Sequence, residues 1–187
     1  LLRTSLGAGV GLWLLEVGAG TLSFLWPNLS GGFGGKVTIG KYSDVKNANA
    51  ALPIAEGFPA YYQEARAFVI LVDPSGQEYF PGEDTSGDGT ALNVRALYQR
   101  CPHLGCKPNP CVKNFWLECA CHGSRYDRLG TKVKELGPAP RSMDRFSVIV
   151  ESDGTLVLDT GKITLGPLPI ALGQPGLEPS KSPTGCI

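Results

Sequence analysis

Net charge is the first property that this sequence lacks, since 17 Lys and Arg residues balance 17 Asp and Glu residues among 187. A phosphate backbone is bound through a basic surplus, so no nucleic-acid partner is expected. Charged residues are also scarce at 18%, yet 42% of the residues are hydrophobic, and this balance excludes a disordered chain. Long helical patterns are rare because 25 Gly and 15 Pro interrupt the chain, which excludes a helical bundle and favours turns and short strands.

Histidine is the scarcest candidate ligand: the chain has two His but six Cys. Both His and four of the Cys lie in two short segments, Cys-Pro-His-Leu-Gly-Cys from Cys101 and Cys-Ala-Cys-His-Gly-Ser from Cys119. Cys101 and His103 form one pair, Cys119 and His122 form the other, and 15 residues separate the two pairs. Paired Cys and His at such spacings predict a metal site with four ligands.

Two metals suit two thiolates and two imidazoles: a tetrahedral zinc ion, or a [2Fe–2S] cluster in which two His replace two Cys on one iron. Cys106 and Cys121 favour the cluster, because a zinc site needs no fifth and sixth thiol. A disulfide between them would clamp two ligand loops together across 14 intervening residues, with an entropic stabilisation of about 3 kcal/mol. It would also place this part of the chain in an oxidising compartment.

The N-terminal segment 1–26 is predicted to be a transmembrane anchor. From Thr4 to Trp26 the only ionisable residue is Glu16, and Pro27 ends the apolar stretch. That length matches the roughly 20 residues that cross a bilayer core, although a buried core helix or an uncleaved signal peptide is the alternative. Glu16 would cost about 2–3 kcal/mol in lipid, which suggests that the anchor packs against other membrane subunits.

Composition divides the rest of the chain into a neck, residues 27–36, a β head, residues 37–165, and a Pro-rich extended tail, residues 166–187. Four Gly among residues 31–35 predict a flexible linker, either a plain connection or a hinge. One short helix is expected at Tyr61–Ala67. Short β-rich runs between turn signals predict strands at Lys36–Gly40, Ala67–Asp73, Leu92–Arg100, Phe115–Ala120, Phe146–Glu151 and Thr155–Leu158.

The two metal-binding segments carry a family resemblance. Cys-Pro-His-Leu-Gly-Cys followed by Cys-Ala-Cys-His-Gly-Ser-Arg-Tyr-Asp resembles the Rieske iron–sulfur proteins, and more narrowly the subunit of cytochrome bc and bf quinol-oxidising complexes. The later Gly-Pro-Ala-Pro-Arg, starting at Gly137, is similar to the proline loop of that subfamily. The motifs span residues 92–160. The implied fold is all-β, an antiparallel Rieske head with a cluster-binding subdomain at about residues 100–142, behind one transmembrane helix.

The resemblance also implies a role for each motif residue. Cys101 and Cys119 would bind one iron of the [2Fe–2S] cluster, and His103 and His122 the other. The remaining roles are a Cys106–Cys121 disulfide, potential-raising hydroxyls on Ser124 and Tyr126, quinol contact by Leu104 and both His, and a cluster-shielding loop of Gly137, Pro138, Ala139 and Pro140.

Cys111 and Cys186 lie outside the family pattern. In an oxidising compartment they could form a second disulfide that fixes the tail across the cluster domain. The alternative is two free thiols, because sequence supplies no distances.

The function that the resemblance implies is electron transfer in a respiratory or photosynthetic quinol:cytochrome c reductase. The subunit would take an electron from quinol, with a proton through a cluster His, and deliver it to a c-type haem by movement of the head. A cytochrome b-type subunit and a c-type cytochrome would be its partners in a dimeric membrane complex, with the head on the oxidising side. The alternatives are a membrane-anchored Rieske carrier, a small subunit of another oxidoreductase, and a zinc-stabilised interaction module.

Overall fold

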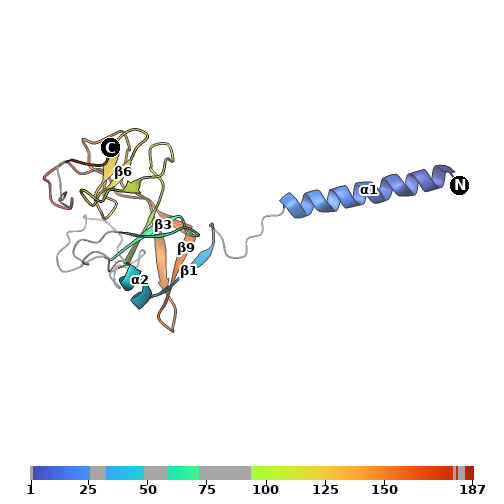
Figure 1. Ribbon diagram of the computed structural model, residues 1–187, viewed down its shortest axis with the longest axis horizontal. Helices are drawn as coiled ribbons and strands as arrows, with labels where there is room; N and C mark the ends of the chain where they lie inside the picture. Colours follow the sequence, from blue (N-terminus) through green and yellow to red (C-terminus); the bar gives the residue numbers. More distant parts are fainter. Residues whose placement is uncertain (1, 26–32, 49–58, 72–93, 179, 181–183) are drawn as a thin grey trace. The chain divides into compact units, whose positions relative to one another are not determined.

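The computed structural model describes residues 2–25, 33–48, 59–71, 94–178, 180 and 184–187 (Figure 1). The chain divides into two compact units, Leu1–Ser30 and Gly31–Ile187. The first unit contains helix α1, Leu2–Leu25, whose 24 residues would span about 36 Å. No side chain of α1 is buried, and its length and apolar composition suffice to cross a membrane. Glu16 is exposed on this helix.

The second unit contains one large sheet and one small sheet, both antiparallel. Strand order in the six-stranded sheet is β1-β9-β8-β4-β3-β2, and in the three-stranded sheet β5-β6-β7. The strands of the large sheet are β1 Lys36–Lys41, β2 Ala60–Tyr62, β3 Ala67–Leu71, β4 Val94–Tyr98, β8 Arg145–Val150 and β9 Thr155–Thr164. The strands of the small sheet are β5 Asn109–Pro110, β6 Leu117–Cys119 and β7 Ser124–Tyr126. The predicted all-β head is confirmed.

Turn chemistry explains the longest hairpin, β8–β9. Asp153 accepts hydrogen bonds from the backbone N–H of Thr155 at 3.0 Å and from its hydroxyl at 2.8 Å. Gly154 has φ of 81°, a left-handed conformation that glycine adopts without steric cost. The register then pairs Val150 with Leu156 and Val148 with Leu158, so alternate side chains of both strands reach the same face.

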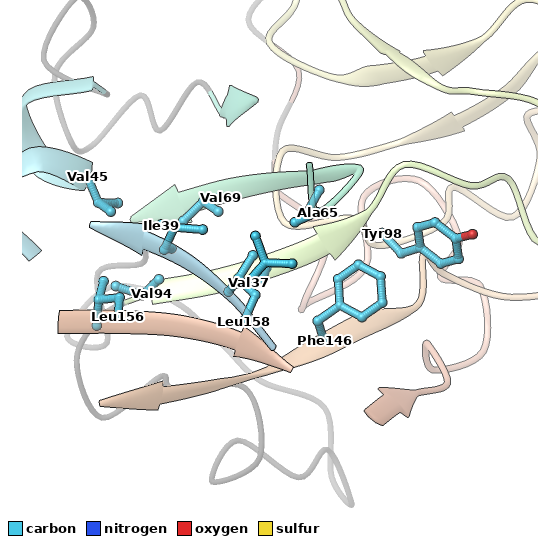
Figure 2. Packing of buried hydrophobic residues seen from close by; sticks show 12 residues of the cluster. Val37, Ile39, Val45, Ala65, Val69, Val94, Tyr98, Phe146, Leu156 and Leu158 are labelled. Atoms are coloured by element: carbon cyan, nitrogen blue, oxygen red, sulfur yellow. The ribbon is translucent and has the colours of Figure 1, made fainter. Parts of the chain in front are cut away.

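The large sheet encloses one hydrophobic cluster (Figure 2). In β1 buried and exposed residues alternate, and Val37 and Ile39 belong to the cluster, whereas all five residues of β4 are buried. Figure 2 shows Phe146 beside Tyr98, with ring centroids 4.9 Å apart. A second cluster surrounds Cys101 and Cys119 on the side of the small sheet. The head therefore has a packing core and a separate apolar site for the candidate ligands.

The local structure of residues 42–48 and 60–67 differs from the sequence prediction. The helix expected at Tyr61–Ala67 is wrong: β2 pairs Ala60 with Val69, and a turn with Arg66 at φ of 49° follows. Pairing against a buried strand outweighs a helical pattern of barely two turns. The sequence reading missed helix α2, Tyr42–Ala48, at whose start Asp44 Oδ2 accepts a 3.0 Å bond from the Lys41 N–H.

The end of the glycine-rich neck is docked on the head. Phe33 packs against Tyr98 and Phe146 with ring centroids 5.3 and 6.0 Å away. The Gly34 N–H donates to Thr160 Oγ1 at 2.8 Å, and that hydroxyl donates to the Gly35 carbonyl at 2.7 Å. Residues 33–35 thus belong to the head, which corrects the flexible linker expected up to residue 36; residues 27–32 of that linker lie outside the described residues.

We predict that Thr160→Val releases this neck segment. Valine keeps the shape of threonine but loses both hydroxyl bonds, so the free energy of unfolding should fall by about 1–2 kcal/mol. Amide exchange at Gly34 should accelerate, which deuterium exchange with mass spectrometry measures. Thr38→Val makes the same change at an exposed position of β1 and should leave exchange at Gly34 unchanged. Equal exchange in all three proteins would contradict the docking role of Thr160.

Candidate metal centre

The first Cys/His loop, residues 101–106, follows β4, and backbone hydrogen bonds join its two ends. The Cys101 N–H donates to the Cys106 carbonyl at 2.7 Å, and the Gly105 N–H donates to the Cys101 carbonyl at 2.9 Å. Gly105 has φ of 83°, which allows the chain to reverse there. The closed loop holds Cys101 at the buried base, whereas Leu104 at its far side is 73% exposed.

The second Cys/His loop is the connection of the β6–β7 hairpin. Cys119 ends β6 and pairs with Ser124, the first residue of β7. The Gly123 N–H donates to the Cys119 carbonyl at 3.0 Å, and Gly123 has φ of 74°. Cys119 is therefore held in the sheet, while His122 in the connection is exposed.

A disulfide joins the two loops. Cys106 and Cys121 are bonded, with their Cα atoms 6.6 Å apart, across a sequence separation of 15 residues. This is the pairing that the family resemblance implied. The bond holds Cys101 and His103 near Cys119 and His122, which lie on a different sheet connection.

Two thiols and two imidazoles converge between the clamped loops. Cys101 and Cys119 are free thiols with 2% and 1% exposure. The imidazole rings of His103 and His122 lie 4.7 Å apart between centroids and are nearly perpendicular, at 88°. Among the described residues no group accepts or donates a hydrogen bond at the buried Nδ1 of His103. A buried nitrogen without a partner is costly, and a bound metal would satisfy it.

The electrostatics of Cys119 fit a thiolate that needs a cation. Burial raises the pKa of the Cys119 thiol, and the neighbouring Cys101 sulfur raises it further. The backbone N–H groups of Cys121 and His122 donate toward the Cys119 sulfur and act in the opposite direction. Two like charges side by side in an apolar interior are unfavourable unless a metal neutralises them. The donor set therefore fits a metal centre with two thiolate and two imidazole ligands.

Hydroxyl groups form a layer behind the thiols. Tyr126 is fully buried, and its hydroxyl lies 3.0 Å from Cys101 Sγ. Burial raises the pKa of Tyr126, the adjacent Cys101 sulfur raises it further, and the Ser124 hydroxyl lowers it. The phenol thus stays protonated and is the donor toward a Cys101 thiolate. Ser124 Oγ accepts a 3.0 Å bond from the Ala139 N–H, which ties this layer to the proline loop.

The proline loop packs directly on the second Cys/His loop. A Cβ added at Gly137 would meet the backbone of Ser124 at 2.2 Å, and Gly137 has φ of 80°. Only glycine fits this contact. Ala139 is buried, whereas Pro138 and Pro140 are exposed. The loop therefore covers one side of the centre and leaves the His122 side open.

A second disulfide, between Cys111 and Cys186, attaches the chain's last described residues to the small sheet. Buried Glu118 reinforces this contact, because its carboxylate accepts bonds from the Cys186 and Ile187 N–H groups at 2.7 and 3.0 Å. Sequence alone leaves the pairing of these two cysteines open, and the structure joins them. Glu118 was missed, since a lone Glu in a strand carries no signal of its role.

The expected extended tail is also packed rather than free over residues 166–178. The Ile170 N–H donates to the Lys132 carbonyl at 2.9 Å, and the Lys134 N–H donates to the Ile170 carbonyl at 2.7 Å. The Glu178 N–H donates to Asp127 Oδ2 at 3.0 Å. These contacts cover the chain that follows β7. In the two ligand loops Leu104, Gly105, Ala120, Cys121 and His122 are exposed.

A disulfide-clamped pair of loops that presents two buried thiols and two imidazoles fits an iron–sulfur protein of the mixed Cys and His type. The Rieske [2Fe-2S] domain family matches residues 66–151. The chloroplastic cytochrome b6-f complex iron-sulfur subunit of Volvox carteri is 30% identical over 158 residues, covering 82% of this chain and 68% of that protein. The chain belongs to the Rieske iron–sulfur protein family, and its cofactor is the Rieske [2Fe–2S] cluster.

Other similarities are shorter or more distant. Cytochrome b6-f complex iron-sulfur subunit 2 of Trichormus variabilis is 44% identical over 94 residues, covering 45% of this chain and 50% of that protein. The solved plasma membrane Rieske protein of Synechocystis PCC 6803 is 20% identical with a TM-score of 0.40, covering 66% of this chain and 98% of that one. The matched segments cover from 29% to 68% of the curated relatives' own lengths.

We predict that Tyr126→Phe lowers the cluster's reduction potential. Loss of a hydroxyl donor to the Cys101 sulfur removes about 1–2 kcal/mol of stabilisation from the more negative, reduced form, or roughly 40–90 mV for one electron. An EPR-monitored redox titration measures the midpoint. Tyr61→Phe removes a hydroxyl from a half-exposed tyrosine of β2 and should not change the midpoint. A Tyr126→Phe midpoint equal to wild type would contradict the role of this hydroxyl.

We predict that buried Asp127 makes the free energy of unfolding depend on pH. Burial raises the pKa of this fully buried carboxyl to about 6, although the Glu178 and Thr131 N–H groups act against the rise. Between about pH 4 and pH 6 the folded state holds a proton that the unfolded state releases, so stability falls as pH rises and levels off above pH 6. The Asp127 contribution should amount to about 3 kcal/mol across this window.

The measurement is thermal or urea unfolding of wild type and Asp127→Asn at several pH values, followed by circular dichroism. Asparagine does not titrate, so the difference in unfolding free energy, wild type minus variant, should fall from pH 4 to pH 7. Parallel pH profiles of the two proteins would contradict the raised pKa.

Proposed function

We propose that this chain is the Rieske subunit of a quinol:cytochrome c reductase-type membrane complex. It takes one electron from quinol, together with one proton through a cluster histidine, and passes the electron to a c-type haem on a partner. The observation that carries the proposal is the asymmetry of the centre. Both thiols are buried, whereas His122 and Leu104 are exposed and His103 is half-buried.

Four side chains would hold the cluster: Cys101 and Cys119 on one iron, His103 and His122 on the other. When bound, the cluster supplies a one-electron acceptor at a potential that neutral imidazole ligands make high for an iron–sulfur centre. Tyr126 and Ser124 stabilise added negative charge by hydrogen bonding and so raise that potential.

The exposed histidines supply a proton site. An imidazole that binds metal through one nitrogen keeps the other for a proton, and the buried Nδ1 of His103 is the inward nitrogen of its ring. The second nitrogen of a cluster histidine, at the exposed edge of the ring, can accept a hydrogen bond from a quinol hydroxyl. Leu104 offers an apolar contact for the quinol ring beside it. The proline loop, Gly137 to Pro140, keeps water from the opposite side of the centre.

The two disulfides and helix α1 support the proposed location. Disulfides persist in oxidising compartments, so the head lies on the oxidising side of the membrane. Helix α1 serves as the single anchor, and Glu16 within it favours packing against neighbouring membrane helices. A cytochrome b-type subunit and a c-type cytochrome, in a dimeric complex, are the proposed partners; the relatives from Volvox and Trichormus are named as cytochrome b6-f subunits.

In the proposed mechanism the head moves to deliver the electron to the haem. The docked end of the neck indicates which residues move together with it. Phe33, Gly34 and Gly35 are fixed to the head through Thr160 and aromatic packing. Residues 33–35 would therefore move with the head.

The test is reduction of the cluster by quinol in membranes or in the purified complex, followed by EPR. The proposal expects reduction by quinol and electron delivery to added cytochrome c. Reduction by dithionite but not by quinol would move the assignment to a membrane-anchored Rieske carrier or a subunit of another oxidoreductase.

We predict that Leu104→Ala slows quinol:cytochrome c reductase activity about tenfold, because an apolar contact of this size contributes about 1.5 kcal/mol. The cluster's midpoint should not change, since Leu104 is no ligand. Val112→Ala removes an equally exposed apolar side chain, at 72% against 73%, from the neighbouring segment and should leave the rate unchanged. Equal rates in both variants would contradict a contact between Leu104 and quinol.

A further inference from the structure

Lys132 is a fully buried lysine, with 0% exposure, in the chain between the second Cys/His loop and the proline loop. Its ammonium donates to the backbone carbonyls of Val133 and Leu136, the latter at 2.6 Å. Within the described part of the chain no carboxylate forms an ion pair with it. Burying an ammonium is costly, and two carbonyl dipoles return only part of that cost. A nearby negative charge would explain its retention in the interior.

The backbone holds Lys132 on the cluster side of the head. Lys132 and Tyr126 form an antiparallel bridge, so their side chains project to the same face of the pair. The Tyr126 hydroxyl on that face lies 3.0 Å from Cys101 Sγ. The Lys132 N–H also donates to Ser142 Oγ at 2.9 Å, which fixes the position of the residue.

The electrostatics of Lys132 point to the same neighbour. Burial lowers the pKa of its ammonium, while the charge of the Cys101 sulfur raises it, more than that of exposed Glu135. The Glu135 carboxylate also accepts a bond from the Leu172 N–H at 3.1 Å. Of these two negative charges, that of the Cys101 sulfur therefore acts on Lys132 more strongly.

We propose that Lys132 is an electrostatic positioning residue that raises the reduction potential of the cluster. Its buried positive charge faces the Cys101 side of the centre and favours the reduced form, which carries one more negative charge. Lys132 and Cys101 are both buried, so the charge acts with little screening. The inference rests on the proposed Cys101 ligand and is independent of quinol as the substrate.

The test is a dye-mediated redox titration of the full chain in detergent, followed by EPR and visible circular dichroism. Lys132→Met and Lys132→Gln both remove the charge, and Gln keeps an N–H donor for the loop carbonyls. Each should lower the equilibrium constant for reduction at least tenfold, which lowers the midpoint by at least 59 mV for one electron. Lys134→Met removes the same charge two residues away at an exposed position and should change the constant less than twofold.

A structural role would give a different result. If Lys132→Gln binds the cluster with the wild-type midpoint, the charge has no effect and the proposal is wrong, even where Lys132→Met loses the cluster. An equal shift in Lys134→Met would assign the effect to net charge. A midpoint shift that disappears in high salt would also assign the effect to net charge and contradict the proposal, because salt screens exposed charges and not buried ones. No quinol enters the measurement, so failure of quinol oxidation and failure of this proposal are separate outcomes.

Discussion

Two buried sulfur atoms on different segments must stay side by side, and the rest of the head is arranged around that constraint. Cys101 follows a strand of the large sheet and Cys119 ends a strand of the small one. Their like charges repel in an apolar interior, so the loops need both a metal and a covalent clamp to remain together. The Cys106–Cys121 disulfide supplies the clamp, and the second apolar cluster keeps water from both sulfur atoms.

The centre combines a closed interior with an open edge, and its chemistry depends on that contrast. The Tyr126 hydroxyl, which we propose tunes the potential, contacts a buried sulfur, where weak screening strengthens its effect. The proposed proton transfer requires solvent or substrate contact, for which exposed His122 is available. In the proposed mechanism, buried groups would therefore set the reduction potential and the exposed edge would exchange the proton.

Charged groups buried around the centre are satisfied chiefly by backbone groups. Asp127 accepts bonds from the Leu129, Thr131 and Glu178 N–H groups, and Glu118 accepts from those of Cys186 and Ile187. These carboxylates pin the tail and loops against the small sheet, much as the second disulfide does. Their arrangement gives the cluster domain a rigid frame on a chain that is rich in Gly and Pro.

The sequence by itself determined the candidate thiol and imidazole ligands, the apolar N-terminal stretch and the all-β class. These follow from local spacing and hydrophobic pattern, which need no long-range information. Only the tertiary structure decided that Cys111 meets Cys186, that Phe33 docks on the head, that Tyr61 lies in a strand, and that Lys132 is buried. Each depends on contacts between residues distant in the chain, where the free energy of packing and pairing outweighs local preference.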